Sequence, residues 1–181
     1  MDQEKALIKK AKNGDEDAFR QLMEGRISAV YNLSLRMMQN CADAEDAAQD
    51  ALVKVFSSLP SFQGQSSFST WVFSVTRNTC LDHLRKRKRR RAQDTPLEFD
   101  LAAGSEYDPE ALAGDNETKR EVALVLKELP EKLRAPLGLK YIDGYSYEEI
   151  AEILDVSTAA VKSRLFRGRD RLRALLSERD F

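Results

Sequence analysis

Hydrophobic residues recur along most of the chain at intervals of three and four positions, which is the spacing of one face of an α-helix. No segment shows the alternation of apolar and polar residues that predicts a β-strand. In the first half of the chain this spacing predicts five helices, which cover about residues 7–12, 15–25, 27–38, 43–59 and 68–91. Between the last two, PSFQGQSS is predicted to be a loop because it is rich in Pro, Gly and Ser.

The helical pattern stops after the fifth helix and returns later in the chain. It then predicts four shorter helices, over about residues 117–129, 131–142, 146–154 and 157–176. The intervening stretch has little periodicity, contains two prolines and two glycines, and is typical of a linker. The fold is therefore predicted to be all-α, with two small helical domains over residues 1–92 and 117–181 and a flexible linker over 93–116.

Composition restricts the class of protein further. The 181 residues are 42% hydrophobic, which allows a packed core, but no apolar run approaches the ~20 residues that a membrane span needs. The N-terminus also lacks the apolar segment of a secretory signal, so we expect a cytoplasmic protein. Cys41 and Cys80 lie far apart, and His83 is the single histidine. No motif for zinc is visible, and we expect neither a metal nor a cofactor.

Charge is nearly balanced over the whole chain but unevenly distributed. There are 29 Lys and Arg against 30 Asp and Glu, with a formal net charge of −1. Residues 85–91, RKRKRRR, are all basic, whereas residues 94–117 contain eight acids and no Lys or Arg. The last predicted helix is basic again. This order predicts contact with nucleic acid at two places, separated by a segment of a different kind.

The stretch SYEEIAEILDVSTAAVKSRLFRGRDRLRALL has the features of a helix-turn-helix. Ser146 and Glu149 form a capping-box pattern, and Asp155 suits the left-handed conformation of a tight turn. Ser157 is predicted to cap the second helix, which is polar and basic. Two short helices joined in this way can place side chains of the second helix in a DNA major groove.

A plainer interpretation is a solvated amphipathic helix within a helical bundle. Basic residues near a helix C-terminus complement the helix dipole, and this explains Arg171 and Arg173. It does not explain the cluster of Lys162, Phe166 and Arg167 nearer the start of the helix. We therefore favour DNA binding over this alternative.

Two longer stretches resemble a known family. They are EDAAQDALVKVFSSLPSFQGQSSFSTWVFSVTRNTCLDHLRKRKR and, later, LPEKLRAPLGLKYIDGYSYEEIAEILDVSTAAVKSRLFRGRDRL. Both are similar to the extracytoplasmic-function (group 4) sigma factors of bacterial RNA polymerase, and most of all to sigma-E-like members. The resemblance covers a sigma-2 domain over residues 1–92 and a sigma-4 domain over about 117–178. It implies a transcription initiation factor that binds core polymerase, directs it to −35/−10 promoters of a stress or envelope-signal regulon, promotes DNA melting and catalyses no reaction itself.

The resemblance assigns polymerase binding to one face of the fourth predicted helix. The residues on this face are Asp46, Gln49, Asp50 and Val53, and their partners would be the β and β′ subunits of the polymerase. Carboxylates and an amide beside an exposed valine suit a mixed polar and apolar protein interface. An ordinary solvated face is the alternative.

The loop at residues 60–67 and the helix after it are assigned to the −10 element. Melting requires that an unstacked base be captured in a pocket, where stacking and edge hydrogen bonds offset the lost pairing. Phe62 and Asn78 would form this pocket, although Phe68 and Trp71 also suit the core. The residues assigned to −10 DNA are Phe62, Ser74, Asn78, Asp82, Arg85 and Lys86. The run of residues 85–91 would lie along phosphates, unless it is a disordered tail.

The last predicted helix is assigned to the −35 element. By resemblance its contact residues are Lys162, Ser163, Arg164, Phe166, Arg167 and Arg169. Arginine and lysine can bind guanine edges, and a phenylalanine can contact thymine methyl groups. Of these residues, Arg164 and Arg169 suit phosphates better. The acidic linker would occupy the nucleic-acid channel of the polymerase; a soluble tether fits its composition equally well.

Other partners and other classes of protein remain to be considered. The resemblance implies promoter DNA and an anti-sigma factor, often membrane-anchored, as partners, with no insertion of this chain into the membrane. A dimeric helix-turn-helix repressor is a second class. It leaves unexplained the loop at residues 60–67, which carries Phe62 and is called the aromatic loop below. A metal-dependent nuclease is a third, built on the acids Asp43, Glu45, Asp46 and Asp50. Acidic residues at the start of a helix are explained more simply by their favourable interaction with the helix dipole, so we disfavour the nuclease.

Overall fold

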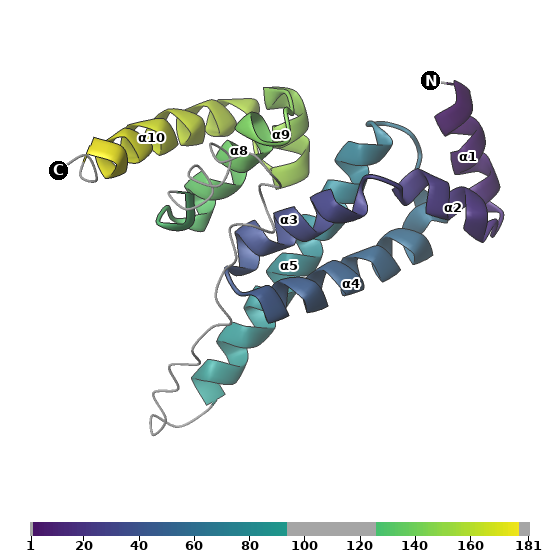
Figure 1. Ribbon diagram of the computed structural model, residues 1–181, viewed down its shortest axis with the longest axis horizontal. Coiled ribbons are helices and arrows are strands. Elements are labelled where there is room, and N and C mark those ends of the chain that lie inside the picture. Colours follow the sequence, from purple (N-terminus) through teal and green to yellow (C-terminus); the bar gives the residue numbers. More distant parts are fainter. Residues whose placement is uncertain (1, 94–125, 178–181) are drawn as a thin grey trace.

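The computed structural model describes residues 2–93 and 126–177, and every regular element in these ranges is helical (Figure 1). In chain order the elements are α1 (Asp2–Lys12), α2 (Glu16–Met23), α3 (Ile27–Met38), α4 (Cys41–Ser58), the short 3-10 helix η1 (Leu59–Ser61), α5 (Phe68–Gln93), α8 (Glu131–Tyr141), α9 (Tyr147–Leu154) and α10 (Thr158–Ser177). The predicted all-α fold is confirmed. The predicted linker from residue 94 onward, and most of the predicted helix over 117–129, lie outside the described residues.

Local side-chain caps decide where several helices begin. The Asp15 carboxylate accepts a hydrogen bond from the Ala18 amide at 2.9 Å, which starts α2. The Asn40 side chain accepts from the Asp43 amide at 2.9 Å and starts α4 two residues before the predicted position. Just before it, Gln39 ends α3 in the left-handed conformation, with φ of 56°.

The first domain, α1 to α5, is built around the mutual contact of α3, α4 and α5. One core cluster joins α1, α2 and the aromatic loop to this group, and its most deeply buried members include Val30, Val55, Phe68 and Val72. Small alanines on the inner side of α4 allow the neighbouring helices to approach closely. This packing leaves one full side of α4 open to solvent.

The second domain contains the predicted helix-turn-helix. The Ser146 hydroxyl accepts from the Glu149 amide at 3.2 Å while the Glu149 carboxylate accepts from the Ser146 amide at 2.9 Å, so the capping box is confirmed. Asp155 takes the left-handed conformation, with φ of 48°, as predicted. Val161, in the first turn of α10, is fully buried in the hydrophobic core, and this identifies the inward side of the second helix of the motif.

The two domains pack directly against each other. Helix α9 contacts α5, and α8 contacts α3, so α8 and α9 lie over the first domain in Figure 1. A single hydrophobic cluster contains buried residues of both domains, and the rings of Phe73 and Tyr145 meet across the junction with centroids 5.2 Å apart. The sequence predicted two domains and a connecting segment, but it gave no indication of this contact.

Candidate nucleic-acid and partner interfaces

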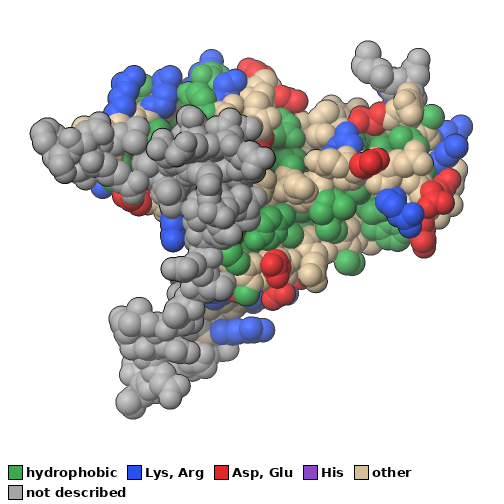
Figure 2. Space-filling view, viewed as in Figure 1, with side chains coloured by type: hydrophobic (Ala, Val, Ile, Leu, Met, Phe, Trp, Pro, Cys, Tyr) green, Lys and Arg blue, Asp and Glu red, His purple; other side chains and the backbone are tan. Residues whose placement is uncertain are grey.

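Helix α10 divides its side chains sharply between two faces. Val161 and Leu165 face inward and are buried, whereas the outward side chains are exposed to solvent. Of the residues assigned to the −35 element, the exposed ones are Lys162, Ser163, Phe166, Arg167 and Arg169. Figure 2 shows Lys and Arg side chains along the upper edge of the molecule, over α10. The side chain of Phe166 is 59% exposed, and on this face it lies among the basic residues Lys162, Arg167 and Arg169.

Arg164 differs from the other residues assigned to the −35 element. It is half-buried and lines a crevice between the domains, together with Arg77 of α5 and Lys132 of α8. In this arrangement Arg164 does not share the outer surface of α10. The remaining five residues do form one continuous surface.

The aromatic loop presents less free surface than its sequence indicates. Phe62 is only 7% exposed. Its ring packs against Phe68 at 5.7 Å and Trp71 at 5.1 Å between centroids, and its carbonyl accepts from Lys12. Phe68 is buried and Trp71 is half-buried, as the core alternative predicted for them. Phe62 therefore belongs to the core in this conformation, and its assignment to DNA stays a prediction that requires local movement.

The outer side of α5 carries the other residues assigned to the −10 element. Asn78 is exposed, and its side-chain oxygen accepts from Arg77 at 3.0 Å. Ser74 is half-buried, and its hydroxyl donates to the Thr70 carbonyl at 3.0 Å. Asn78 is thus the polar side chain here that is most available to a base edge, and Ser74 is less so.

The basic end of α5 is helical through the described residues, so it is not a disordered tail up to Gln93. Arg85 and Lys86 are exposed and can contact phosphates. Arg87 instead donates to Asp43 of α4 at 2.8 Å. Asp82 accepts from Arg85 at 3.2 Å, and its carboxylate also lies 3.4 Å from the Lys54 ammonium group of α4.

The polymerase-binding residues predicted on α4 share an open surface. Asp46, Gln49, Asp50 and Val53 are all exposed, and Val53 is 67% exposed. The Nε2 atom of His83 on α5 lies 2.8 Å from the Asp50 carboxylate, which holds that side chain in one orientation. Together with the Asp43–Arg87 and Lys54–Asp82 pairs, this contact fixes α4 against α5 through polar groups.

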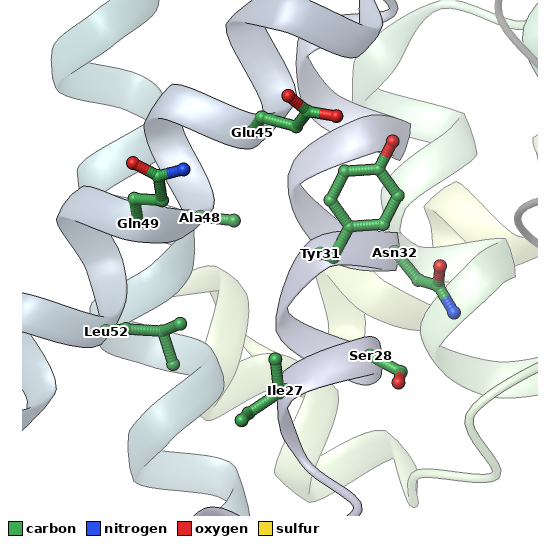
Figure 3. A pocket seen from close by; sticks show the side chains of 8 residues that line it. All are labelled: Ile27, Ser28, Tyr31, Asn32, Glu45, Ala48, Gln49 and Leu52. Atoms are coloured by element: carbon green, nitrogen blue, oxygen red, sulfur yellow. The ribbon is translucent and has the colours of Figure 1, made fainter.

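A groove beside this surface was not predicted. It lies between α3 and α4, has a volume of about 390 Å³, and Ile27, Tyr31 and Leu52 form its apolar walls (Figure 3). Gln49 lines the groove and also belongs to the exposed α4 surface. Phe56 continues the apolar side chains along α4 and is itself exposed. Leu52 and Phe56 are four residues apart on the outer side of α4, and this spacing in the sequence could have predicted an apolar surface there.

Two of the acidic residues of α4, Asp43 and Asp50, have partners within the protein. Asp43 binds Arg87, and Asp50 lies against His83. In residues 2–93 and 126–177, no group of three or more His, Cys, Asp or Glu side chains is placed to hold a metal ion. Among the helices in these same ranges, none combines the length and apolar character that crossing a membrane requires.

Comparison with known proteins gives the family. Residues 22–90 match Sigma-70 region 2, and residues 119–172 match Sigma-70 region 4. The chain is 34% identical to the ECF RNA polymerase sigma factor SigW of Bacillus subtilis, over 96% of this chain and 97% of that protein. It is 32% identical to the ECF RNA polymerase sigma-E factor of Escherichia coli K12, over 92% of this chain and 91% of that protein.

Two solved structures of sigma factors also resemble this chain. The sigma factor RpoE of Bartonella quintana, in complex with the anti-sigma factor NepR, matches with a TM-score of 0.68 and 25% identity, over 88% of this chain and 96% of that one. CnrH in complex with the cytosolic domain of CnrY matches with a TM-score of 0.68 and 26% identity, over 97% and 98%. The helix-turn-helix, the exposed α4 face and these likenesses lead to one conclusion: this chain belongs to the extracytoplasmic-function sigma factors, the promoter-specific initiation factors of RNA polymerase.

Proposed function

We propose that the chain directs core RNA polymerase to its promoters through three separate surfaces, one each on α4, α5 and α10. The observation that carries this proposal is the division of α10, which buries Val161 and Leu165 and exposes Phe166 and Arg167 on the opposite side. An exposed phenylalanine among basic residues offers both an apolar contact and positive charge, which is the combination that a base edge and its neighbouring phosphates require. In a major groove, Arg167 binds a guanine edge and Phe166 covers a thymine methyl group.

The α4 surface binds the β and β′ subunits of the polymerase. Asp46, Gln49, Asp50 and Val53 give it the mixed polar and apolar character of a specific protein interface. The neighbouring groove, with Leu52 and the exposed Phe56, extends the apolar part of this surface toward α3. A partner helix could bury this groove and hydrogen-bond to Gln49 at its rim.

The α5 surface acts on the −10 element. Asn78 reads an exposed base edge, and Arg85 and Lys86 bind the phosphates just upstream. Phe62 joins the pocket after the loop at residues 60–67 rearranges, because it is packed against Phe68 and Trp71 in this conformation. Residues 1–92 and 117–181 are the two DNA-binding domains, and residues 93–116 connect them.

An anti-sigma factor is a further partner. The solved relatives described above are complexes with NepR and with the cytosolic domain of CnrY, which supports such a partner here. The likeness to the ECF sigma factors SigW and sigma-E supports a stress or envelope-signal regulon. Membership of the sigma-70 family supports a cytoplasmic location. The chain itself catalyses no reaction; the polymerase makes the RNA.

The test is reconstitution of the chain with core polymerase. Promoter-specific RNA should appear only when both components are present. Arg167→Ala should reduce the use of promoters that depend on the −35 element, and Asn78→Ala should impair opening more than initial binding. Tight, specific duplex binding by the isolated chain, with no effect on the polymerase, would instead identify a repressor.

A further inference from the structure

The crevice that Arg164 lines gathers positive charge from three helices. It has a volume of about 180 Å³, and Arg77 of α5, Lys132 of α8 and Arg164 of α10 all line it. Glu131 is the one acidic residue among the described residues that line it. Three basic groups and one acidic group leave a net charge of +2 around this hollow, although the whole chain has a formal net charge of −1.

The basic side chains of this crevice are not neutralised by the protein itself. Across residues 2–93 and 126–177, the side chains of Lys132 and Arg164 form neither an ion pair nor a hydrogen bond, and Arg77 donates only to the amide oxygen of Asn78, at 3.0 Å. Glu131 lines the same hollow but pairs with none of the three in those ranges. A guanidinium has five N–H donors, so both arginines retain donors for a ligand.

The walls of the crevice strengthen the effect of these charges. Arg77 and Arg164 are half-buried. Met37, Leu81 and Leu154 are among the apolar residues that line the same hollow. Apolar walls lower the local dielectric constant, so like charges repel one another more strongly here than in open water. A cleft of this kind concentrates anions from solution, and a bound anion relieves the repulsion.

The donors of the crevice favour the chemistry of phosphate. A guanidinium is a planar fork that binds phosphate oxygens in pairs, and a lysine ammonium group adds a compact point charge. Cations from three different helices suit an anion that presents oxygens in several directions. A volume of 180 Å³ corresponds to about six water molecules at ~30 Å³ each, which gives room for two linked phosphate groups but not for a nucleic-acid duplex.

We propose that this crevice is a binding site for a small diphosphate anion, held by Arg77, Lys132 and Arg164. The anion is either free pyrophosphate or the diphosphate group of a nucleotide whose nucleoside lies outside the hollow. The site is separate from the surfaces proposed for polymerase and for DNA, and it does not depend on the proposed function. It also gives a role to Arg164, which was assigned to the −35 element but does not lie on the outer surface of α10.

Isothermal titration calorimetry of the full chain tests the site, with inorganic pyrophosphate as the ligand. The ionic strength is held constant, because salt screens charge attraction, and divalent cations are left out, because they bind pyrophosphate. The wild type should bind one equivalent with a Kd below about 1 mM. Arg164→Gln should weaken binding roughly ten- to hundredfold, which is the usual value of a hydrogen bond to a charged group. Lys132→Gln should weaken it several-fold, because Lys132 is exposed and its charge is better screened.

Arg171→Gln is the matched control. It removes the same charge from an exposed position of α10 that does not line the crevice, so pyrophosphate should bind as it does to the wild type. Circular dichroism should show equal helix content in all four proteins. If Arg164→Gln loses helix content, the comparison of Lys132→Gln with Arg171→Gln decides the outcome, because both change exposed side chains.

Titration with a nucleoside diphosphate distinguishes the two sources of the anion. Equal or weaker binding than pyrophosphate would identify the free anion as the ligand, and tighter binding would identify a nucleotide; both results support the site. Absence of binding by either compound below about 1 mM would overturn it. So would an equal loss of affinity in Arg171→Gln and in the crevice variants, since the attraction would then be diffuse. If Arg164→Gln weakened binding to a −35 duplex but left pyrophosphate binding intact, Arg164 would belong to the DNA surface and the proposed site would be wrong.

Discussion

Two adjacent residues of α10 allow the roles of folding and recognition to be separated. Leu165 is 2% exposed and packs inside the second domain, whereas Phe166, the next residue, points into solvent. We consider Leu165→Ala and Phe166→Ala as a matched pair, because each removes a large apolar side chain from the same turn of the same helix. The structure predicts opposite consequences for stability and for promoter binding.

The magnitudes follow from burial. Leu165→Ala should lower the free energy of unfolding by about 2–5 kcal/mol, because it creates a cavity in the core. Phe166→Ala should change it by no more than about 0.5 kcal/mol, as is usual for an exposed residue. If DNA covers the exposed 59% of Phe166, it removes about 120 Å² from water, from a total of roughly 200 Å². At ~25 cal/mol/Å² this is at most about 3 kcal/mol, so promoter affinity should fall roughly ten- to hundredfold.

The assays are urea denaturation of the isolated chain and promoter binding by the reconstituted holoenzyme. With an m-value of about 2 kcal/mol/M, Leu165→Ala should lower the urea midpoint by about 1–2.5 M. Phe166→Ala should leave the midpoint unchanged and weaken binding only at promoters that contain the −35 element. If Phe166→Ala destabilised the fold as much as Leu165→Ala and left promoter affinity intact, the assignment of the outer face of α10 to DNA would be refuted.

Four further outcomes follow from local geometry. Gly168→Ala should lower the thermal unfolding temperature, because the new Cβ atom would lie 2.8 Å from Cδ1 of Leu137, and this crowding should outweigh the better helix propensity of alanine. An unchanged or raised unfolding temperature would show that the Leu137 side chain moves aside freely. Ser146→Ala should cost about 1 kcal/mol in urea denaturation by removing the cap of α9, and Ser146→Thr should retain most of it. Burial raises the pKa of the Cys80 thiol from 9.0 to about 11, so the thiol loses its proton at lower pH in the unfolded chain than in the folded one. The free energy of unfolding should therefore fall as the pH rises from 9 toward 11. Cys80→Ala should remove that part of the pH dependence. In the native protein a thiol reagent should modify half-buried Cys41 well before Cys80.

The helix-turn-helix could be predicted from the sequence because the interactions that define it are local. The capping box joins Ser146 to a residue three positions away, and the left-handed turn depends on Asp155 alone. The inward positions Val161 and Leu165 repeat at helical spacing. Each of these signals acts within one or two turns of helix, so tertiary packing had little opportunity to change the outcome.

The contact between the domains could not be predicted in the same way. Within α3, Arg36 has the pattern of a solvated arginine on an amphipathic helix, and its acidic partner is 107 residues away in the sequence. Periodicity gives the face of a helix but not the element that covers it. Phe62 illustrates the same limit, since an aromatic residue in a polar loop suits both a binding pocket and the small core that it joins here.

Helix α5 connects the exposed face of α4 to the contact between the domains. One side of α5 holds α4 through the His83–Asp50 and Lys54–Asp82 contacts, and another side contacts α9 and packs Phe73 against Tyr145, just before α9.

Separation of the domains exposes Phe73, Tyr145 and other apolar side chains of the shared core, which disfavours an open state in water.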